Sequence, residues 1–252
     1  MTHVLSKGEV CKVYDSPSWQ RMLFSEFEST LTSKSRPFPC IFGVTGMKSD
    51  QLRYVFLDAI EADVLAPALR SYLSVARDIG RMTSLVVFAR PGPVQGIEAY
   101  RARFWSILDE LERIDGAPRP AGVSRRLDTP SWEFCFAGEP IFVVCNSPAH
   151  VLRQSRRSTS FMITFQPRWV FEGLTDSDDP AVLKSLRTVR ERLASFDAIE
   201  TSPHLGTYGD PKTREFRQYF IDDTNEVPVC PFHSLGRKDA EDDIDQGEGK
   251  VA

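Results

Sequence analysis

Apolar side chains recur at the spacing of one helix face in several parts of the chain. Trp19, Leu23, Phe24 and Phe27 follow this spacing near the amino end, and residues 96–114 give the clearest amphipathic pattern. Apolar and basic positions near the carboxyl end recur with the same period. The pattern predicts helices over residues 18–28, about 63–78, 96–114 and 182–196.

Short apolar runs bounded by turn-forming residues predict strands. These runs cover residues 38–42, 54–57, 85–88, 132–136, 141–145 and 160–165. Residues 43–46 read as a turn, and residues 138–140 predict the turn of a β-hairpin. Strands outnumber clear β–α–β units, so the chain is expected to have an α+β fold, with a mixed or antiparallel sheet flanked by helices.

A single domain is the simpler organisation, because no repeat and no low-complexity linker divides the chain. Residues 115–124 are rich in Gly and Pro but short enough to be a loop. Residues 1–236 are expected to form the α+β domain. Residues 237–252 are charged and nearly free of core-forming side chains, which predicts a disordered acidic tail.

Composition narrows the class of protein. The 252 residues include 31 Lys and Arg against 35 Asp and Glu, and a net charge of −4 argues against nucleic-acid binding. No apolar run approaches the ~20 residues that cross a bilayer, and the amino end lacks a secretory pattern. Five cysteines without a CxxC pair argue against a disulfide framework and a zinc site. A reduced, cytoplasmic protein is expected.

His150 is the first candidate for chemistry, because it directly follows a predicted buried strand and Pro148 stiffens the turn that presents it. Neutral imidazole is a suitable ligand for haem iron. Arg153 and Arg156 would share a helical face, and two guanidinium groups can bind paired carboxylates such as haem propionates or a substrate carboxylate. Spacing alone favours a plainer interpretation, in which His150 caps the strand and the arginines are solvated.

Cys230 is the second candidate. It precedes Pro231, which restricts the local backbone, and a thiolate at this position would ligate haem iron. The competing interpretation is that this segment docks Phe232 on the core. Cys40 lies in a predicted strand between apolar residues and reads as a small buried hydrophobe.

Glu133 lies between Trp132 and Phe134 in a predicted strand. Alternation places its carboxylate on the opposite face from the two aromatic rings, and such a side chain usually faces solvent. In a cavity, the carboxylate would pair bidentately with a guanidinium group. No GxGxxG, P-loop, GxSxG or HExxH pattern is present, so nucleotide and common hydrolase chemistries have no support.

Six segments resemble the YqcI/YcgG family in the same order along the chain. They are FPCIFG at 38–43, WEFCFAGEP at 132–140, NSPAHVLRQSR at 146–156, FQPRWVF at 165–171, PHLGTYG at 203–209 and CPF at 230–232. Each segment alone is weak, but the ordered set is specific and covers most of the chain. The family includes haem-dependent N-hydroxylases of guanidine groups, and the chain looks closest to the one that acts on arginine in D-cycloserine biosynthesis.

The resemblance implies a haem b cofactor (iron protoporphyrin IX), O2 or peroxide as oxidant, and an external electron-donor protein or reductant. The implied reaction converts L-arginine to Nω-hydroxy-L-arginine in natural-product biosynthesis. The site residues carried over are His150 as iron ligand, Arg153 and Arg156 at the propionates, Phe38 and Cys230 beside the cofactor, and His204 and Glu133 as polar groups at the substrate.

The iron ligand stays open between His150 and Cys230, since a thiolate favours O–O cleavage and a histidine would need a supporting hydrogen bond. Two other functions compete with the oxygenase. One is a non-catalytic haem sensor or carrier, and the other is a haem-free interaction domain. A homodimer also remains open.

Overall fold

The computed structural model describes residues 3–173, 179–206 and 210–228. Its elements follow one another as α1 (Lys7–Val13), α2 (Trp19–Thr32), α3 (Ile41–Lys48), β1 (Leu52–Leu57), α4 (Ala62–Ile79), β2 (Ser84–Ala89), α5 (Ile97–Ile114), β3 (Phe134–Phe136), β4 (Glu139–Asn146), η1 (Gln154–Arg156), β5 (Met162–Pro167), η2 (Arg168–Phe171), α6 (Pro180–Phe196) and α7 (Phe216–Tyr219). The segments η1 and η2 are short 3₁₀-helices.

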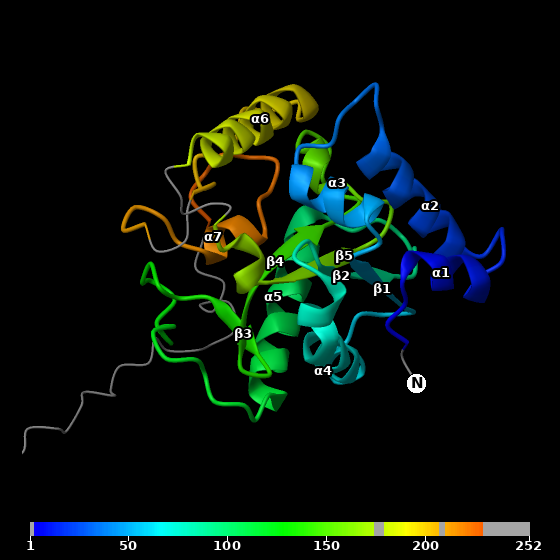
Figure 1. Ribbon diagram of the computed structural model, residues 1–252, viewed down its shortest axis with the longest axis horizontal. Helices are drawn as coiled ribbons and strands as arrows, with labels where there is room; N and C mark the ends of the chain where they lie inside the picture. Colours follow the sequence, from blue (N-terminus) through cyan, green and yellow to red (C-terminus); the bar gives the residue numbers. More distant parts are fainter. Residues whose placement is uncertain (1–2, 174–178, 207–209, 229–252) are drawn as a thin grey trace, which may run out of the picture.

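A five-stranded sheet with the order β1-β2-β5-β4-β3 runs through the middle of the molecule (Figure 1). β1 and β2 are parallel, and the other neighbouring strands are antiparallel. β3 and β4 form the predicted hairpin, whose turn residues Ala137 and Gly138 have φ of 53° and 76°, as a tight two-residue turn requires. The predicted α+β single-domain fold with a mixed sheet is confirmed.

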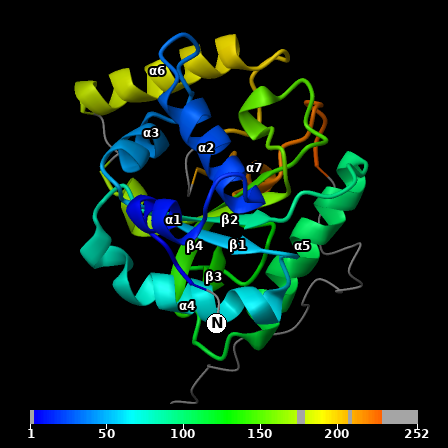
Figure 2. The same cartoon turned by 90° about the vertical axis from the view of Figure 1, so that its right-hand side faces the viewer.

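Helices cover both faces of this sheet (Figures 1 and 2). On one face, Leu69 of α4 and Phe104 of α5 share the larger core cluster with Val87 of β2. On the other face, α1 and α2 cover β1 and β2, and Phe24 meets the ring of Tyr54 edge to face at 5.0 Å. Because both faces are covered, all six residues of β2 are buried, which explains its continuous apolar run.

The helical layer on the second face is not continuous. Beyond β2, the elements that cover β5 and β4 are α6 and η1, and a cavity separates them from the sheet. Among the described residues, no helix is both long enough and apolar enough to cross a membrane.

The sequence predicts the long helices and the strands of the sheet, and it is wrong for residues 38–46. The predicted strand and turn are a loop followed by α3. The thiol of Cys40 caps this helix by accepting a hydrogen bond from the N–H of Gly43 at 3.3 Å. A short helix that is apolar around most of its circumference has no periodicity that distinguishes it from a buried strand.

Helix α1 was also missed, although its signal is present in the sequence. Ser6 and Glu9 form a capping box, in which the Ser6 hydroxyl accepts from the Glu9 N–H and the Glu9 carboxylate accepts from the Ser6 N–H. The spacing of these two residues is enough to propose a helix start.

Helix α3 lies very close to the chain that enters β2. A Cβ atom placed on Gly46 would be 2.4 Å from the carbonyl oxygen of Met82, so only glycine fits this contact. The close approach fixes α3, and with it the position of the Cys40 thiol at the start of the helix.

We expect Gly46→Ala to lower the free energy of unfolding by about 1–3 kcal/mol, because the added methyl group cannot fit against the Met82 carbonyl unless α3 shifts. Gly8→Ala in α1 is the matched control, since no atom lies within 4 Å of its Cβ position and alanine favours helix by up to ~1 kcal/mol. Urea denaturation followed by circular dichroism measures both variants. Equal stability of the two would contradict the packing described here.

Candidate functional site

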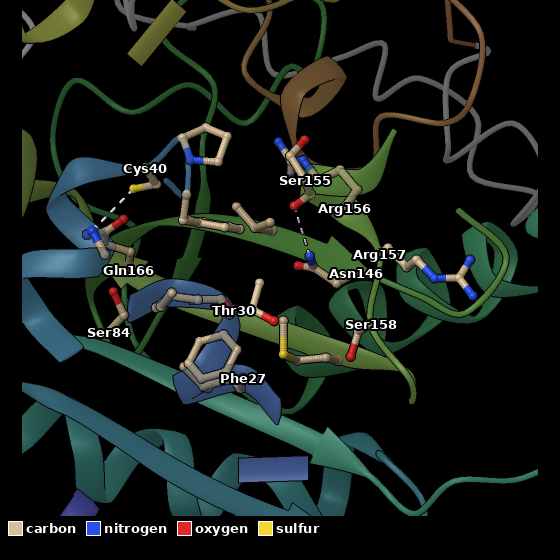
Figure 3. Close-up of a pocket in the computed structure, with 18 of the residues that line it drawn as sticks. Phe27, Thr30, Cys40, Ser84, Asn146, Ser155, Arg156, Arg157, Ser158 and Gln166 are labelled. Atoms are coloured by element: carbon tan, nitrogen blue, oxygen red, sulfur yellow. Dashed lines mark hydrogen bonds between the residues drawn. The ribbon is translucent and has the colours of Figure 1, made fainter. Parts of the chain in front are cut away.

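A cavity of about 370 Å³ lies between the second face of the sheet and the elements α2, η1 and α6 (Figure 3). Its walls are mainly apolar, with Phe27 from α2, Phe88 from β2, Met162 from β5 and Leu193 from α6. The volume falls within the ~300–1,000 Å³ typical of small-molecule and cofactor sites. The cavity therefore has the size and the walls of a ligand site.

Cys40 supplies a thiol to this cavity (Figure 3). Burial raises the pKa of the thiol, whereas the N–H groups at the start of α3 and the guanidinium of Arg156 act in the opposite direction. The thiol forms no disulfide within the part of the chain that the structure describes. A metal bound at the sulfur would add the positive charge that stabilises a thiolate. None of the described residues that line the cavity is a histidine, so Cys40 offers the strongest iron ligand among them.

Arg156 is the second polar group of the cavity wall. Its Nη2 donates to the carbonyl oxygen of Gln218 at 3.1 Å, and its Nη1 is buried without a hydrogen-bond partner in the described parts of the chain. Burial lowers the pKa of Arg156 to about 10, so the group is still a cation at neutral pH.

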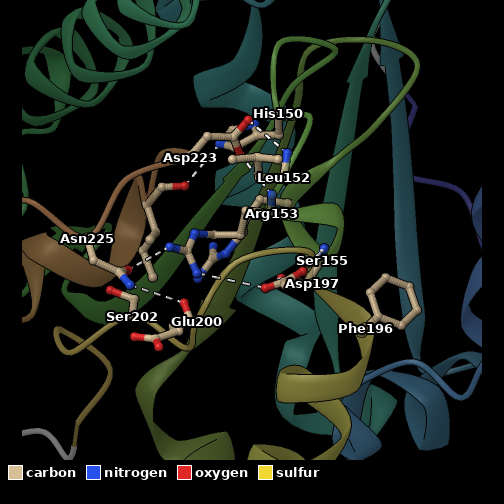
Figure 4. A network of polar contacts seen from close by, with 12 residues as sticks. His150, Leu152, Arg153, Ser155, Phe196, Asp197, Glu200, Ser202, Asp223 and Asn225 are labelled. Carbon is tan, nitrogen blue, oxygen red and sulfur yellow. Dashed lines mark hydrogen bonds and ion pairs between the residues drawn. The ribbon is translucent and has the colours of Figure 1, made fainter.

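His150 lies outside this cavity and connects two segments of the chain (Figure 4). Its Nε2 is 3.0 Å from the carbonyl oxygen of Ile221, and its Nδ1 is 2.9 Å from the hydroxyl of Ser147. A carbonyl oxygen can only accept, so Nε2 carries the proton and Nδ1 accepts from Ser147. Burial lowers the pKa of His150 to about 4, against these hydrogen bonds. Both nitrogens are occupied, and ligation of iron would require one of these bonds to break.

Arg153 is also part of a structural network. Its guanidinium donates to the carbonyl oxygens of Asp222 and Thr224 at 2.7 and 3.1 Å and to Asn225 Oδ1 at 2.9 Å. Asp197 lies 3.8 Å from the same guanidinium. Arg153 touches the cavity wall but has its donors committed, so the predicted pairing of Arg153 and Arg156 on one ligand has no geometric support here.

Glu133 is fully buried, and the expectation that it faces solvent is wrong. Its two carboxylate oxygens accept from Nε of Arg168 at 2.7 and 2.9 Å, and the same guanidinium binds Glu215. Burial raises the pKa of Glu133 to about 7, although Arg168 opposes the shift. The predicted carboxylate–guanidinium pair exists, but its guanidinium belongs to the protein and the pair does not line the cavity.

The other predicted site residues lie in different places. Phe38 lines the cavity and meets the ring of Phe196 edge to face at 5.5 Å. His204 is outside the cavity lining, and its Nε2 lies 3.0 Å from the carbonyl oxygen of Glu226. Cys230 lies outside the described residues.

Two cavity residues were missed or misread from sequence. Cys40 was read as a packing residue, since cysteine is not among the common helix caps that mark a helix start. Glu26 was not singled out; it is exposed, lines the cavity, and accepts a hydrogen bond from the Thr159 hydroxyl at 2.5 Å. Its position on α2 carries no sequence signal, because an exposed glutamate on an amphipathic helix is ordinary.

Fold and site together define a class: a single-domain α+β protein with an apolar, ligand-sized cavity that holds one thiol and one incompletely paired guanidinium. The sequence comparisons give the family. The YqcI/YcgG family profile matches residues 27–233, and the chain belongs to this family.

Three relatives match over most of their length. YqcI and YcgG of Bacillus subtilis (strain 168), both named as uncharacterised proteins, are 39% and 41% identical over 245 and 228 residues. These alignments cover 93% and 87% of this chain and 96% and 90% of the relatives. DcsA of Streptomyces lavendulae, named as a candidate Nω-hydroxy-L-arginine synthase, is 31% identical over 234 residues, which cover 88% of this chain and 87% of DcsA. No solved structure matches.

The raised pKa of Glu133 makes the stability of the protein depend on pH. The folded protein keeps this proton up to about pH 7 while the unfolded chain loses it near the ordinary value of 4.5, so stability falls as the pH rises between these values. We expect Glu133 to lower the free energy of unfolding of the wild type by at most about 1.4 kcal/mol per pH unit in this range. Glu133→Gln should lack this contribution, because an amide does not titrate.

Urea denaturation at several pH values between 4.5 and 8 measures the effect. Glu110→Gln on α5, where the glutamate side chain is 47% exposed, is the control and should follow the wild type. A wild type and a Glu133→Gln variant with the same pH dependence would contradict the buried, protonated carboxyl group.

The two hydrogen bonds of His150 predict a structural role. His150→Ala should lower the free energy of unfolding by about 2–4 kcal/mol, because it leaves a cavity and an unpaired carbonyl oxygen at Ile221. The exposed His3→Ala is the control and should change stability little. The contribution of His150 to stability should shrink as the pH falls from about 6.5 towards 4, where the unfolded chain takes up a proton that the folded state does not, so the loss in His150→Ala should be smaller at pH 4.5 than at pH 7. Equal stability of the two alanine variants would contradict this role.

Proposed function

We propose that this protein is a haem-dependent oxygenase that hydroxylates a guanidino nitrogen, with L-arginine as substrate and Nω-hydroxy-L-arginine as product. The observation that carries the proposal is an apolar cavity of ligand size with a thiol on its wall. The name of DcsA supports the choice of reaction. The reaction would serve natural-product biosynthesis of the D-cycloserine type.

The residues of the cavity fit a haem b group. Its apolar walls suit a porphyrin, and the thiol of Cys40 suits its iron. The sulfur of Cys40 would hold the iron in preference to His150, whose two ring nitrogens already have partners. Cys230 remains the competing thiol. Phe38 would contact the ring system from the cavity wall.

Bound haem would supply the activation of oxygen, and the protein would supply position and electrostatics. With O2, an external donor contributes two electrons and two protons, one oxygen atom is added to the guanidino nitrogen, and the other leaves as water. Peroxide would supply the oxidant without the electron donor. A thiolate ligand favours O–O cleavage, which is the chemical reason to prefer cysteine.

The substrate guanidinium requires a carboxylate to hold it. Glu133 is hydrogen-bonded to Arg168, so its carboxylate holds that arginine in place and would not bind the substrate. Glu26 lines the cavity with an exposed side chain, and we propose that it orients the substrate guanidinium. His204 would not contact the substrate, because its Nε2 is hydrogen-bonded to the carbonyl oxygen of Glu226. Its role would be to hold its loop in place.

The thiol ligand is tested by absorption spectroscopy of the protein loaded with haem. Cys40→Ser keeps a good helix cap and replaces the sulfur, so we expect a folded variant that loses the red-shifted Soret band of a thiolate-ligated ferrous carbon monoxide complex. Cys11→Ser, on the exposed side of α1, is the matched control and should keep this band. His150→Gln and Cys230→Ser test the two competing ligands.

Turnover completes the test. The wild type with haem, a reductant and oxygen should form Nω-hydroxy-L-arginine, and Cys40→Ser should lose at least about 100-fold in rate if the thiolate drives O–O cleavage. Haem binding without turnover on any guanidine would favour a haem sensor or carrier. A wild type that refuses haem would contradict both functions.

A further inference from the structure

We propose that Arg156 is the anchor of a carboxylate-binding subsite inside the cavity, and that the ligand of this cavity carries at least one carboxylate. The subsite itself rests only on the cavity and its charges. Its assignment to a haem propionate or to the carboxylate of an amino acid rests on the proposed function.

The guanidinium of Arg156 is buried with incomplete partners. Among the described residues, Nη1 of Arg156 is inaccessible to solvent and has no hydrogen-bond partner, and Nη2 has a neutral partner, the carbonyl oxygen of Gln218. A buried guanidinium that lacks an anion is costly, because desolvation is not repaid by a counter-charge. An anion that enters the cavity would repay this cost.

The nearby carboxylate of Asp197 already has other partners. Asp197 accepts from the N–H and hydroxyl of Ser155 at 2.6 and 2.9 Å and lies 3.8 Å from Nη1 of Arg153. No ion pair joins Asp197 to Arg156 among the described residues. Arg153 therefore has a carboxylate at ion-pair distance, whereas Asp197 acts on Arg156 only from further away, although the two arginines are three residues apart in the chain.

The surroundings define the class of anion. The charged residues that line the cavity are Arg153, Arg156 and Arg157 against Glu26 and Asp197, and Asn146 and Gln166 add neutral polar groups (Figure 3). Three cations against two anions leave one positive charge, which matches one carboxylate attached to an apolar or aromatic body. A phosphate dianion would leave a net charge in the cavity, so the geometry favours the carboxylate.

A pair of fluorescent probes tests the subsite independently of haem. Dansylglycine and dansylglycinamide have nearly the same size and differ in the carboxylate. The wild type should bind dansylglycine roughly 10- to 100-fold more tightly than the amide, since a charged hydrogen bond in a buried site is lost with the amide. Arg156→Gln should remove this preference, Arg156→Lys should keep part of it, and Arg187→Gln on the exposed side of α6 should leave it unchanged.

Two further comparisons distinguish a haem propionate from a substrate carboxylate as the group that Arg156 binds. Haem and haem dimethyl ester are titrated into the protein without haem, and L-arginine and agmatine, which lacks the carboxylate, are titrated into the haem-loaded protein. If Arg156 holds a propionate, Arg156→Gln should weaken the binding of haem and leave the binding of its dimethyl ester unchanged. If Arg156 holds the substrate, Arg156→Gln should weaken the binding of L-arginine and leave the binding of agmatine unchanged.

Equal wild-type affinity for dansylglycine and its amide, or a preference that survives in Arg156→Gln, would overturn the subsite. Absence of dansylglycine binding to the wild type would overturn it as well. Thermal melting confirms that each variant is folded. A protein that prefers the carboxylate probe but refuses haem would keep the subsite and reject the proposed function, so the two failures are distinguishable.

Discussion

The fold around the cavity depends on how the segment 215–225 is bonded to the connection between β4 and β5. His150 donates to the Ile221 carbonyl oxygen, and Asp223 accepts from three successive backbone N–H groups, those of residues 151–153 (Figure 4). Arg153 adds donors to the carbonyl oxygens of the same segment. The bonds of His150 and Arg153 are buried or partly buried, so leaving one of them unmade would be costly. The connection is thereby held in one conformation.

These hydrogen bonds distinguish residues whose polar groups support the fold from residues whose polar groups can still bind a ligand. His150 and Arg153 are hydrogen-bonded to this segment, whereas Nη1 of Arg156 is buried and has no acceptor among residues 3–173, 179–206 and 210–228. On the opposite side of the cavity, the close contact at Gly46 fixes α3 and presents Cys40 at its first turn. The thiol of Cys40 and the cation of Arg156 therefore line the same cavity from two elements, α3 and η1. Each element is held in place by different contacts, and a ligand site requires such rigid supports.

Periodicity was sufficient for the long helices and the sheet, because amphipathic helices and buried strands have distinct patterns. It failed at residues 38–46, where an apolar helix is capped by the unusual residue Cys40. For the candidate site, some residues of the ordered motifs line the cavity, but the motifs did not indicate the direction of each side chain. His150, Arg153 and Arg156 lie within seven residues, and only tertiary hydrogen bonds with residues about 70 positions away decide which of them stays open.

We propose that the ligand binds in the cavity between the sheet and α6, with His150 as part of the support. A crystal structure of the protein with haem would show whether this is so. We expect the porphyrin inside the cavity, the iron bound by the sulfur of Cys40, and an intact hydrogen bond from His150 to Ile221. Iron bound to the imidazole of His150, with the segment 215–225 displaced, would contradict it.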